Sequence, residues 1–264
     1  MAAMDESVFS VDCCSRRRAL CRLGIAVAGS LAGHGPWLAL AADGSDTEPP
    51  HRDPFLIVLP QVDPAFALRV RQAVTGVPAP LRRQLCQAGW RCVVSTDLVS
   101  YVPELAGQRP RGWPAGASWA QVDAVHLPQQ RQVIVAQWRK NARGDRVACH
   151  RVPGAVWHEL GHAWDVFARQ QAAEGRPLPR ACYSESPDFL EAWKKDMAGL
   201  TARAADSRWN YYLQGNHRGR QEIFAEAFAV SLGSGSDEHL ADEFAQGFPS
   251  VCRLVREWLD GLGR

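Results

Sequence analysis

The chain has 264 residues, enough for one sizeable domain or two small ones, and its 46% hydrophobic and 22% charged residues are ordinary for a globular protein. Its formal net charge is only +2, and the many arginines are scattered rather than clustered. We therefore expect neither a nucleic-acid partner nor strong attraction to an anionic membrane surface.

Residues 1–41 have the features of an export signal. Three arginines follow Ser15, an apolar stretch extends from Leu23 to Leu40, and Ala39-Leu40-Ala41 offers an A-x-A cleavage site. The paired arginines resemble a twin-arginine signal, although Ala19 stands where the usual aromatic residue would be, and an ordinary secretory signal is the alternative. We expect an exported protein, periplasmic or secreted, with no stable membrane insertion after signal cleavage.

Five cysteines remain after removal of this signal, and an oxidising compartment would permit two disulfides with one thiol left over. Cys86 and Cys92 bracket a turn, and Cys149 and Cys182 flank the predicted helix 153–171. These two pairings are the candidates, and five buried free thiols are the alternative.

The polar, proline-containing segment 42–54 is typical of a linker, which leaves 55–264 as one domain. A Pro- and Gly-containing loop is expected at 102–116. The expected strands are 55–59, 91–95, 122–127 and 132–138, and the expected helices are 65–74, 80–87, 153–171, 187–204, 220–232, 237–246 and 249–262. This order predicts an α+β fold, in which a small mixed sheet is followed by a mostly helical half.

Residues His158-Glu159-Leu160-Gly161-His162 spell H-E-x-x-H, the helical zinc motif of many metallopeptidases. Two histidines four residues apart lie on one helix face, one turn from each other, so both imidazoles can reach one metal ion. Zinc lowers the pKa of water to about 7, and the Glu159 carboxylate can then take its proton. The alternative is an exposed amphipathic helix with solvated histidines.

A catalytic zinc site needs a third protein ligand. In one known pattern this ligand is a histidine six residues after the second, but Ala168 occupies that place. The apolar stretch 221–230 carries Glu222 and Glu226 on one helix face, and buried carboxylates are rare unless they are paired or bind metal. Glu222 is the candidate ligand, and Glu226 the candidate acceptor of a hydrogen bond from a ligand histidine. The alternative is that arginines pair with both.

The run from His158 to Asp165, together with Glu222-Ile-Phe-Ala-Glu-Ala-Phe228, resembles the catalytic domain of the anthrax lethal factor type of metallopeptidase. That group includes bacterial secreted Pro-Pro endopeptidases. The resemblance covers 55–247 and is specific in these two motifs. It implies a zincin-like fold of the gluzincin type, zinc (Zn2+) held by His158, His162 and Glu222, and Glu159 as general base.

The residue that stabilises the oxyanion is less well defined. Members of this group have a catalytic tyrosine seven residues before the third ligand, where this chain has Gly215. Tyr212 is the candidate, and Tyr211 and His217 are the alternatives.

Two further features flank the motif. Asp165, one turn beyond His162, either orients a ligand or joins a local hydrogen-bond network, and an ordinary surface aspartate is an equal alternative. Upstream, Val133–Ala136 is expected to be an edge strand that pairs with an extended substrate through main-chain hydrogen bonds. A plain structural strand is the alternative, because strand addition needs an exposed edge.

These observations predict an exported zinc-dependent endopeptidase that hydrolyses a protein or peptide substrate by metal-activated water, with Glu159 as general base. The alternative is a non-catalytic extracytoplasmic module of the same fold that binds zinc or a partner. Glu159 favours the enzyme, because a purely structural zinc site would not need that carboxylate. The cleavage-site preference and the oligomeric state are not defined by the sequence.

Overall fold

The computed structural model describes residues 53–110, 113, 115–173, 183–200, 209, 212–235 and 238–262. The expected export signal, the linker up to residue 52 and the candidate Tyr211 lie outside the described residues. Asp53 and Pro54, which we expected at the end of the linker, belong to the fold. The Asp53 carboxylate lies 3.1 Å from the Arg82 guanidinium.

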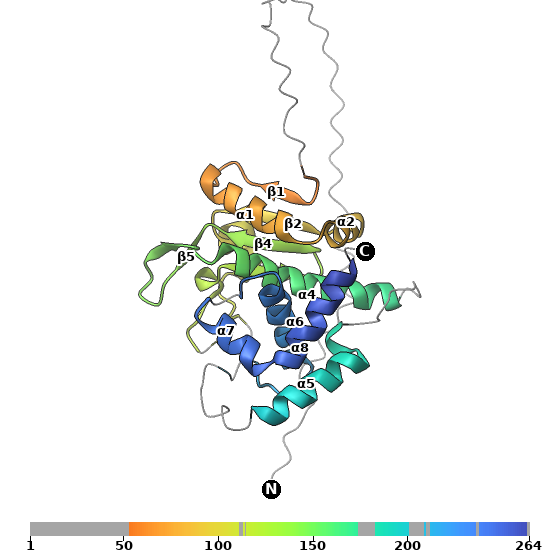
Figure 1. Ribbon diagram of the computed structural model, residues 1–264. Coiled ribbons are helices and arrows are strands. Elements are labelled where there is room, and N and C mark those ends of the chain that lie inside the picture. Colours follow the sequence, from red (N-terminus) through yellow and green to blue (C-terminus); the bar gives the residue numbers. More distant parts are fainter. Residues whose placement is uncertain are drawn as a thin grey trace, which may run out of the picture. The chain divides into compact units, whose positions relative to one another are not determined.

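A four-stranded sheet forms the first half of the fold (Figure 1). In spatial order its strands are β1 (Leu56–Val58), β2 (Arg91–Ser95), β4 (Gln132–Ala136) and β3 (Ala124–Leu127). β1, β2 and β4 are parallel, and β3 is antiparallel to β4. The expected small mixed sheet is confirmed. The expectation that Val133–Ala136 is an edge strand is wrong: β4 pairs with β2 on one side and with β3 on the other, so the edge strands are β1 and β3.

Local chemistry accounts for the start of the first helix. α1 (Pro64–Gly76) starts after Asp63, whose side chain accepts hydrogen bonds from the main-chain N–H groups of the first turn, and proline suits the first helical position. α2 (Ala79–Gln87) follows directly. Strand residues alternate between two hydrophobic cores: Cys92 and Val94 belong to the core shared with α1, and Val93 to a second core on the other face.

α4 (Val152–Ala173) lies between the sheet and the helices that follow α4 in the chain (Figure 1). It packs against α1, β3 and β4, and also against α6 (His217–Ser231). α5 (Pro187–Gly199), α7 (Glu238–Gly247) and α8 (Pro249–Leu262) complete the helical half, which confirms the expected fold class. Within the described residues, no helix combines the length and apolar character needed to cross a membrane.

Some boundaries differ from the expected ones. α6 begins three residues before the expected position 220, because the Asn216 side chain accepts hydrogen bonds from the N–H groups of Arg218 and Gly219 and so caps the helix. The helix expected at 187–204 is described as far as Gly199, and 201–208 lie outside the described residues. Among the described residues, the short elements α3 (Leu98–Tyr101), β5 (Trp138–Lys140) and β6 (Arg146–Ala148) were not predicted. The same is true of three short 3-10 helices, at Pro103–Leu105, Trp119–Gln121 and Tyr183–Glu185.

The expected disulfide between Cys86 and Cys92 is wrong, because both residues are free thiols, as are Cys149 and Cys252. Cys182, the expected partner of Cys149, lies outside the described residues. Cys92 is fully buried within β2, and burial raises the pKa of the Cys92, Cys149 and Cys252 thiols to about 12. These three side chains are therefore neutral and pack as small apolar groups.

Candidate metal and active site

The close approach of α4 and α6 depends on Gly161, inside the H-E-x-x-H motif. A Cβ built at Gly161 would lie only 2.9 Å from Cα of Ala225 and 3.1 Å from Cβ of Phe228, nearer than real side chains come. The missing side chain therefore lets the two helices meet at the motif itself. As a result, the carboxylates of α6 reach the histidines of α4.

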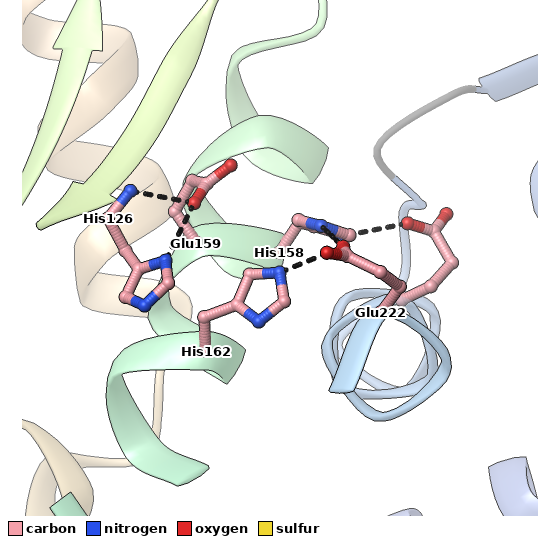
Figure 2. A network of polar contacts seen from close by, with 6 residues as sticks. His126, His158, Glu159, His162 and Glu222 are labelled. Atoms are coloured by element: carbon pink, nitrogen blue, oxygen red, sulfur yellow. Dashed lines mark hydrogen bonds and ion pairs between the residues drawn. The ribbon is translucent and has the colours of Figure 1, made fainter. Parts of the chain in front are cut away.

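His158, His162 and Glu222 come together at this crossing (Figure 2). All three are buried, and their possible ligand atoms lie within 4.8 Å of one another. Glu222 Oε2 is 3.0 Å from His162 Nε2 and 3.4 Å from His158 Nε2. Ala168, at the place where a third histidine would stand in another zinc pattern, is buried in the core.

The spacing of this cluster is compatible with one bound metal ion. Zinc binds nitrogen and oxygen at about 2.0–2.2 Å, so neighbouring ligand atoms of a tetrahedral site lie roughly 3.3–3.6 Å apart. The separations of Glu222 Oε2 from the two imidazole nitrogens are close to this range. Two imidazoles and one carboxylate are also a donor set that suits zinc.

Glu226 contacts the same cluster from the next turn of α6. Its Oε2 lies 2.8 Å from Nδ1 of His158, and the Glu226 side chain is fully buried. With Nδ1 donating to Glu226, Nε2 of His158 is the nitrogen that faces Glu222. A carboxylate that orients a histidine in this way is typical of the surroundings of metal sites. The two histidines thus supply partners for both buried glutamates.

Imidazoles and carboxylates of this buried cluster stabilise each other's charged forms. Burial disfavours the charged form of His158, but its hydrogen bonds to Glu222 and Glu226 hold the pKa of this imidazole well above its usual value. Burial likewise disfavours the Glu222 carboxylate, yet His162 and His158 hold the pKa of Glu222 well below its usual range. Both shifts express the attraction between the imidazoles and the carboxylates in a buried place.

Glu159 lies beside this cluster and faces the sheet. Its Oε2 accepts a hydrogen bond of 2.8 Å from the main-chain N–H of His126, on the edge strand β3. Nδ1 of His126 is 3.7 Å from the same oxygen, and the His126 ring stacks on that of His162, with centroids 4.8 Å apart (Figure 2). The Glu159 carboxylate therefore lies next to the His-His-Glu cluster but is directed away from Glu222.

Sequence reasoning missed His126. The alternation of β3 offers a weak signal, since His126 shares a strand face with Ala124, which is buried in the core that contains α4. Its partner Glu159 is 33 positions away in the chain, however, so no local pattern joins the two residues.

Asp165 is buried, and its carboxylate forms hydrogen bonds with Ser184, in the segment that follows α4. Its carboxylate accepts hydrogen bonds from the N–H of Ser184 at 2.9 Å and from the Ser184 hydroxyl at 2.7 Å. Arg169 lies 3.5 Å away on the next turn. These contacts agree with the local hydrogen-bond network that was one expected role. The expectation of an ordinary surface aspartate is wrong, because the side chain is enclosed.

The oxyanion candidates lie in different surroundings. Tyr212 is buried, with its ring against Phe244 at 5.2 Å and Trp209 at 6.3 Å between centroids. His217 is exposed at the first position of α6, and Gly215 is exposed just before it. A Cβ built at position 215 would meet nothing within 4 Å.

The fold and the buried His-His-Glu cluster are compatible with a metal-dependent peptidase. No family model and no curated protein sequence matches this chain. Among solved structures, its fold is similar to that of the Pro-Pro endopeptidase PPEP-2 from Paenibacillus alvei, with a TM-score of 0.51 and 19% sequence identity over 78% of this chain and 98% of that one. At this identity the comparison establishes the fold alone: the chain shares its architecture with that endopeptidase.

Proposed function

We propose that this protein is an exported zinc-dependent endopeptidase. The observation that carries the proposal is the buried cluster of His158, His162 and Glu222, with Glu159 beside it on the same helix. The similarity of the fold to a Pro-Pro endopeptidase supports peptide-bond hydrolysis as the reaction. The export signal expected in residues 1–41 supports a periplasmic or secreted location.

Each residue of the cluster has a distinct task in this proposal. Zinc, when bound, polarises the scissile carbonyl and makes water more acidic. His158 and His162, through Nε2, and Glu222, through a carboxylate oxygen, would hold the ion, and Glu226 would orient His158. Glu159 takes a proton from the attacking water and gives it to the leaving amine. Tyr212 remains the proposed donor to the oxyanion.

The substrate is proposed to be an extended peptide that adds to β3. The N–H of Ala136 donates to the carbonyl of Asp123, and the strand register pairs Val125 with Ile134. Because inward and outward main-chain groups alternate in an antiparallel pair, Ala124 directs its N–H and carbonyl away from β4. His126 does the same, but its N–H already donates to Glu159, which leaves its carbonyl for a substrate. A peptide strand can bond to such an edge whatever its side chains are. We therefore propose that β3, rather than Val133–Ala136, is the strand that pairs with the substrate.

Metal analysis and peptide cleavage by the purified, processed protein test this function. We expect one zinc per chain and cleavage of members of a diverse peptide library that includes Pro-Pro sequences. Glu159→Gln should keep the zinc and lose nearly all turnover, because it removes the base and no ligand. Zinc without cleavage of any library member would favour the non-catalytic zinc-binding module. A protein that binds no zinc would refute both alternatives.

A further inference from the structure

We propose that His126 is a positioning residue for Glu159, a role that rests on the proposed function. The main-chain N–H and the imidazole of His126 both approach Glu159 Oε2, at 2.8 and 3.7 Å (Figure 2). One residue thus places a hydrogen-bonded N–H and a nearby imidazole at one oxygen of the carboxylate. The other oxygen, Oε1, is then the atom that takes the proton from water and returns it to the leaving amine.

The geometry of the edge strand explains how one residue supplies both contacts. In β3 the side chains of Ala124 and His126 share the sheet face that packs on α4, and Val125 packs on the opposite core. The strand register directs the main-chain N–H of His126 toward the open edge. Glu159 extends from α4 to this edge, where it meets the N–H and the ring together.

His126 also links the base to the metal cluster. Its ring stacks on His162 with an interplanar angle of 19° and a centroid separation of 4.8 Å. Glu159 and His162 lie on successive turns of α4, so one imidazole restrains the side chains of both. Displacement of a reacting group by about 1 Å can lower a rate by roughly 100-fold. We therefore expect His126 to affect turnover more than it affects metal or substrate binding.

The first test needs no enzymatic activity. Amide hydrogen exchange of the zinc-loaded protein, measured by NMR, should show a protected N–H at His126. Glu159→Ala removes the acceptor and should speed this exchange by at least about 10-fold, whereas Glu159→Gln keeps an acceptor oxygen and should not. The N–H of Val125, which faces β4, is the internal control. Unchanged exchange at His126 in Glu159→Ala would refute the contact.

The second test separates the ring's polar contact from its stacking. His126→Phe keeps a stacked ring without Nδ1, His126→Ala removes both, and His126→Asn keeps a short side chain with an N–H donor. In all three variants zinc affinity should fall much less than kcat. We expect kcat to fall about 10–100-fold in the Phe and Ala variants with KM within about 3-fold, and to recover partly in the Asn variant.

Three outcomes of this second test would overturn the role of His126. They are wild-type kcat in His126→Phe, no recovery in His126→Asn, and a loss of zinc that parallels the loss of turnover in every variant. Failure of the proposed function would look different. The wild type would then cleave no peptide, while the exchange experiment would still decide whether His126 holds Glu159.

Discussion

Gly235, in the loop after α6, lies so close to Glu226 that a Cβ at this position would be 2.6 Å from Glu226 Oε1. The other oxygen of this carboxylate, Oε2, contacts His158 Nδ1 at 2.8 Å. The missing side chain of Gly235 therefore leaves the space that the orienting carboxylate occupies. The loop between α6 and α7 thus helps to set the position of a proposed zinc ligand, although it contributes no ligand itself.

Gly235→Ala should weaken zinc binding by about 10–100-fold, the usual effect of disturbing a group that orients a metal ligand. Its methyl group would displace the Glu226 carboxylate from His158. Gly261→Ala is the matched control, since a Cβ there meets nothing within 4 Å. Competition with a chromogenic chelator measures both affinities, and equal values for the two variants would contradict the prediction.

The two glutamates of α6 should differ in their effect on the metal. Glu222→Ala removes a proposed ligand and should strip most of the zinc, whereas Glu226→Ala should weaken affinity or activity by about 10–100-fold. The residues lie one turn, or about 6 Å, apart along the helix axis, so only one can be at bonding distance. Zinc dissociation rates of both variants decide the matter. Loss of metal in Glu226→Ala alone would reverse the two roles.

Gly161→Ala should destabilise the fold and weaken zinc binding together. The added methyl group meets the backbone of Ala225, which cannot rotate away, and overpacking of this kind costs about 1–3 kcal/mol. Gly199→Ala, where a Cβ meets nothing within 4 Å, controls for the change in helix propensity. Urea unfolding and zinc titration provide the measurements. Normal values of both for Gly161→Ala would show that the helices can separate without loss.

Tyr212→Phe tests the oxyanion assignment with little risk to the fold, because the phenyl ring keeps the packing against Phe244 and Trp209. Turnover should fall by roughly 100-fold if the hydroxyl donates a hydrogen bond in the transition state, and KM should change little. Steady-state kinetics on a peptide found by library screening are sufficient. Unchanged turnover would transfer the role to His217 or Tyr211, and His217→Ala then becomes the next variant.

Export can be tested without knowledge of the substrate. The protein recovered from the cell envelope or the medium should begin near Ala42, after the A-x-A site at 39–41. Arg16→Lys and Arg17→Lys together should retain the precursor in the cytoplasm if the twin-arginine route is used. Intact-mass spectrometry of each fraction reports the cleavage. A full-length wild-type chain found only in the cytoplasm would contradict the proposed location.

Local spacing was sufficient to predict much of this molecule. His158 and His162 share a face of α4, and Glu222 and Glu226 share a face of α6, because residues four apart lie one helical turn from each other. The starts of α1 at Pro64 and of α5 at Pro187 are also set by neighbouring residues. The side chains of Asp63 and Ser186 accept hydrogen bonds from N–H groups in the first turn of each helix. These features depend on hydrogen bonds between neighbours in the chain, so the sequence alone determined them.

Other features were decided only by tertiary structure. The contact of His162 with Glu222 joins residues 60 positions apart, and it depends on how closely Gly161 lets α6 approach α4. The role of β3 as edge strand follows from the pairing of β4 with β2, and it alone brings His126 to Glu159. Such contacts depend on how whole elements pack. Periodicity specifies the face on which a residue lies but not the element that covers that face.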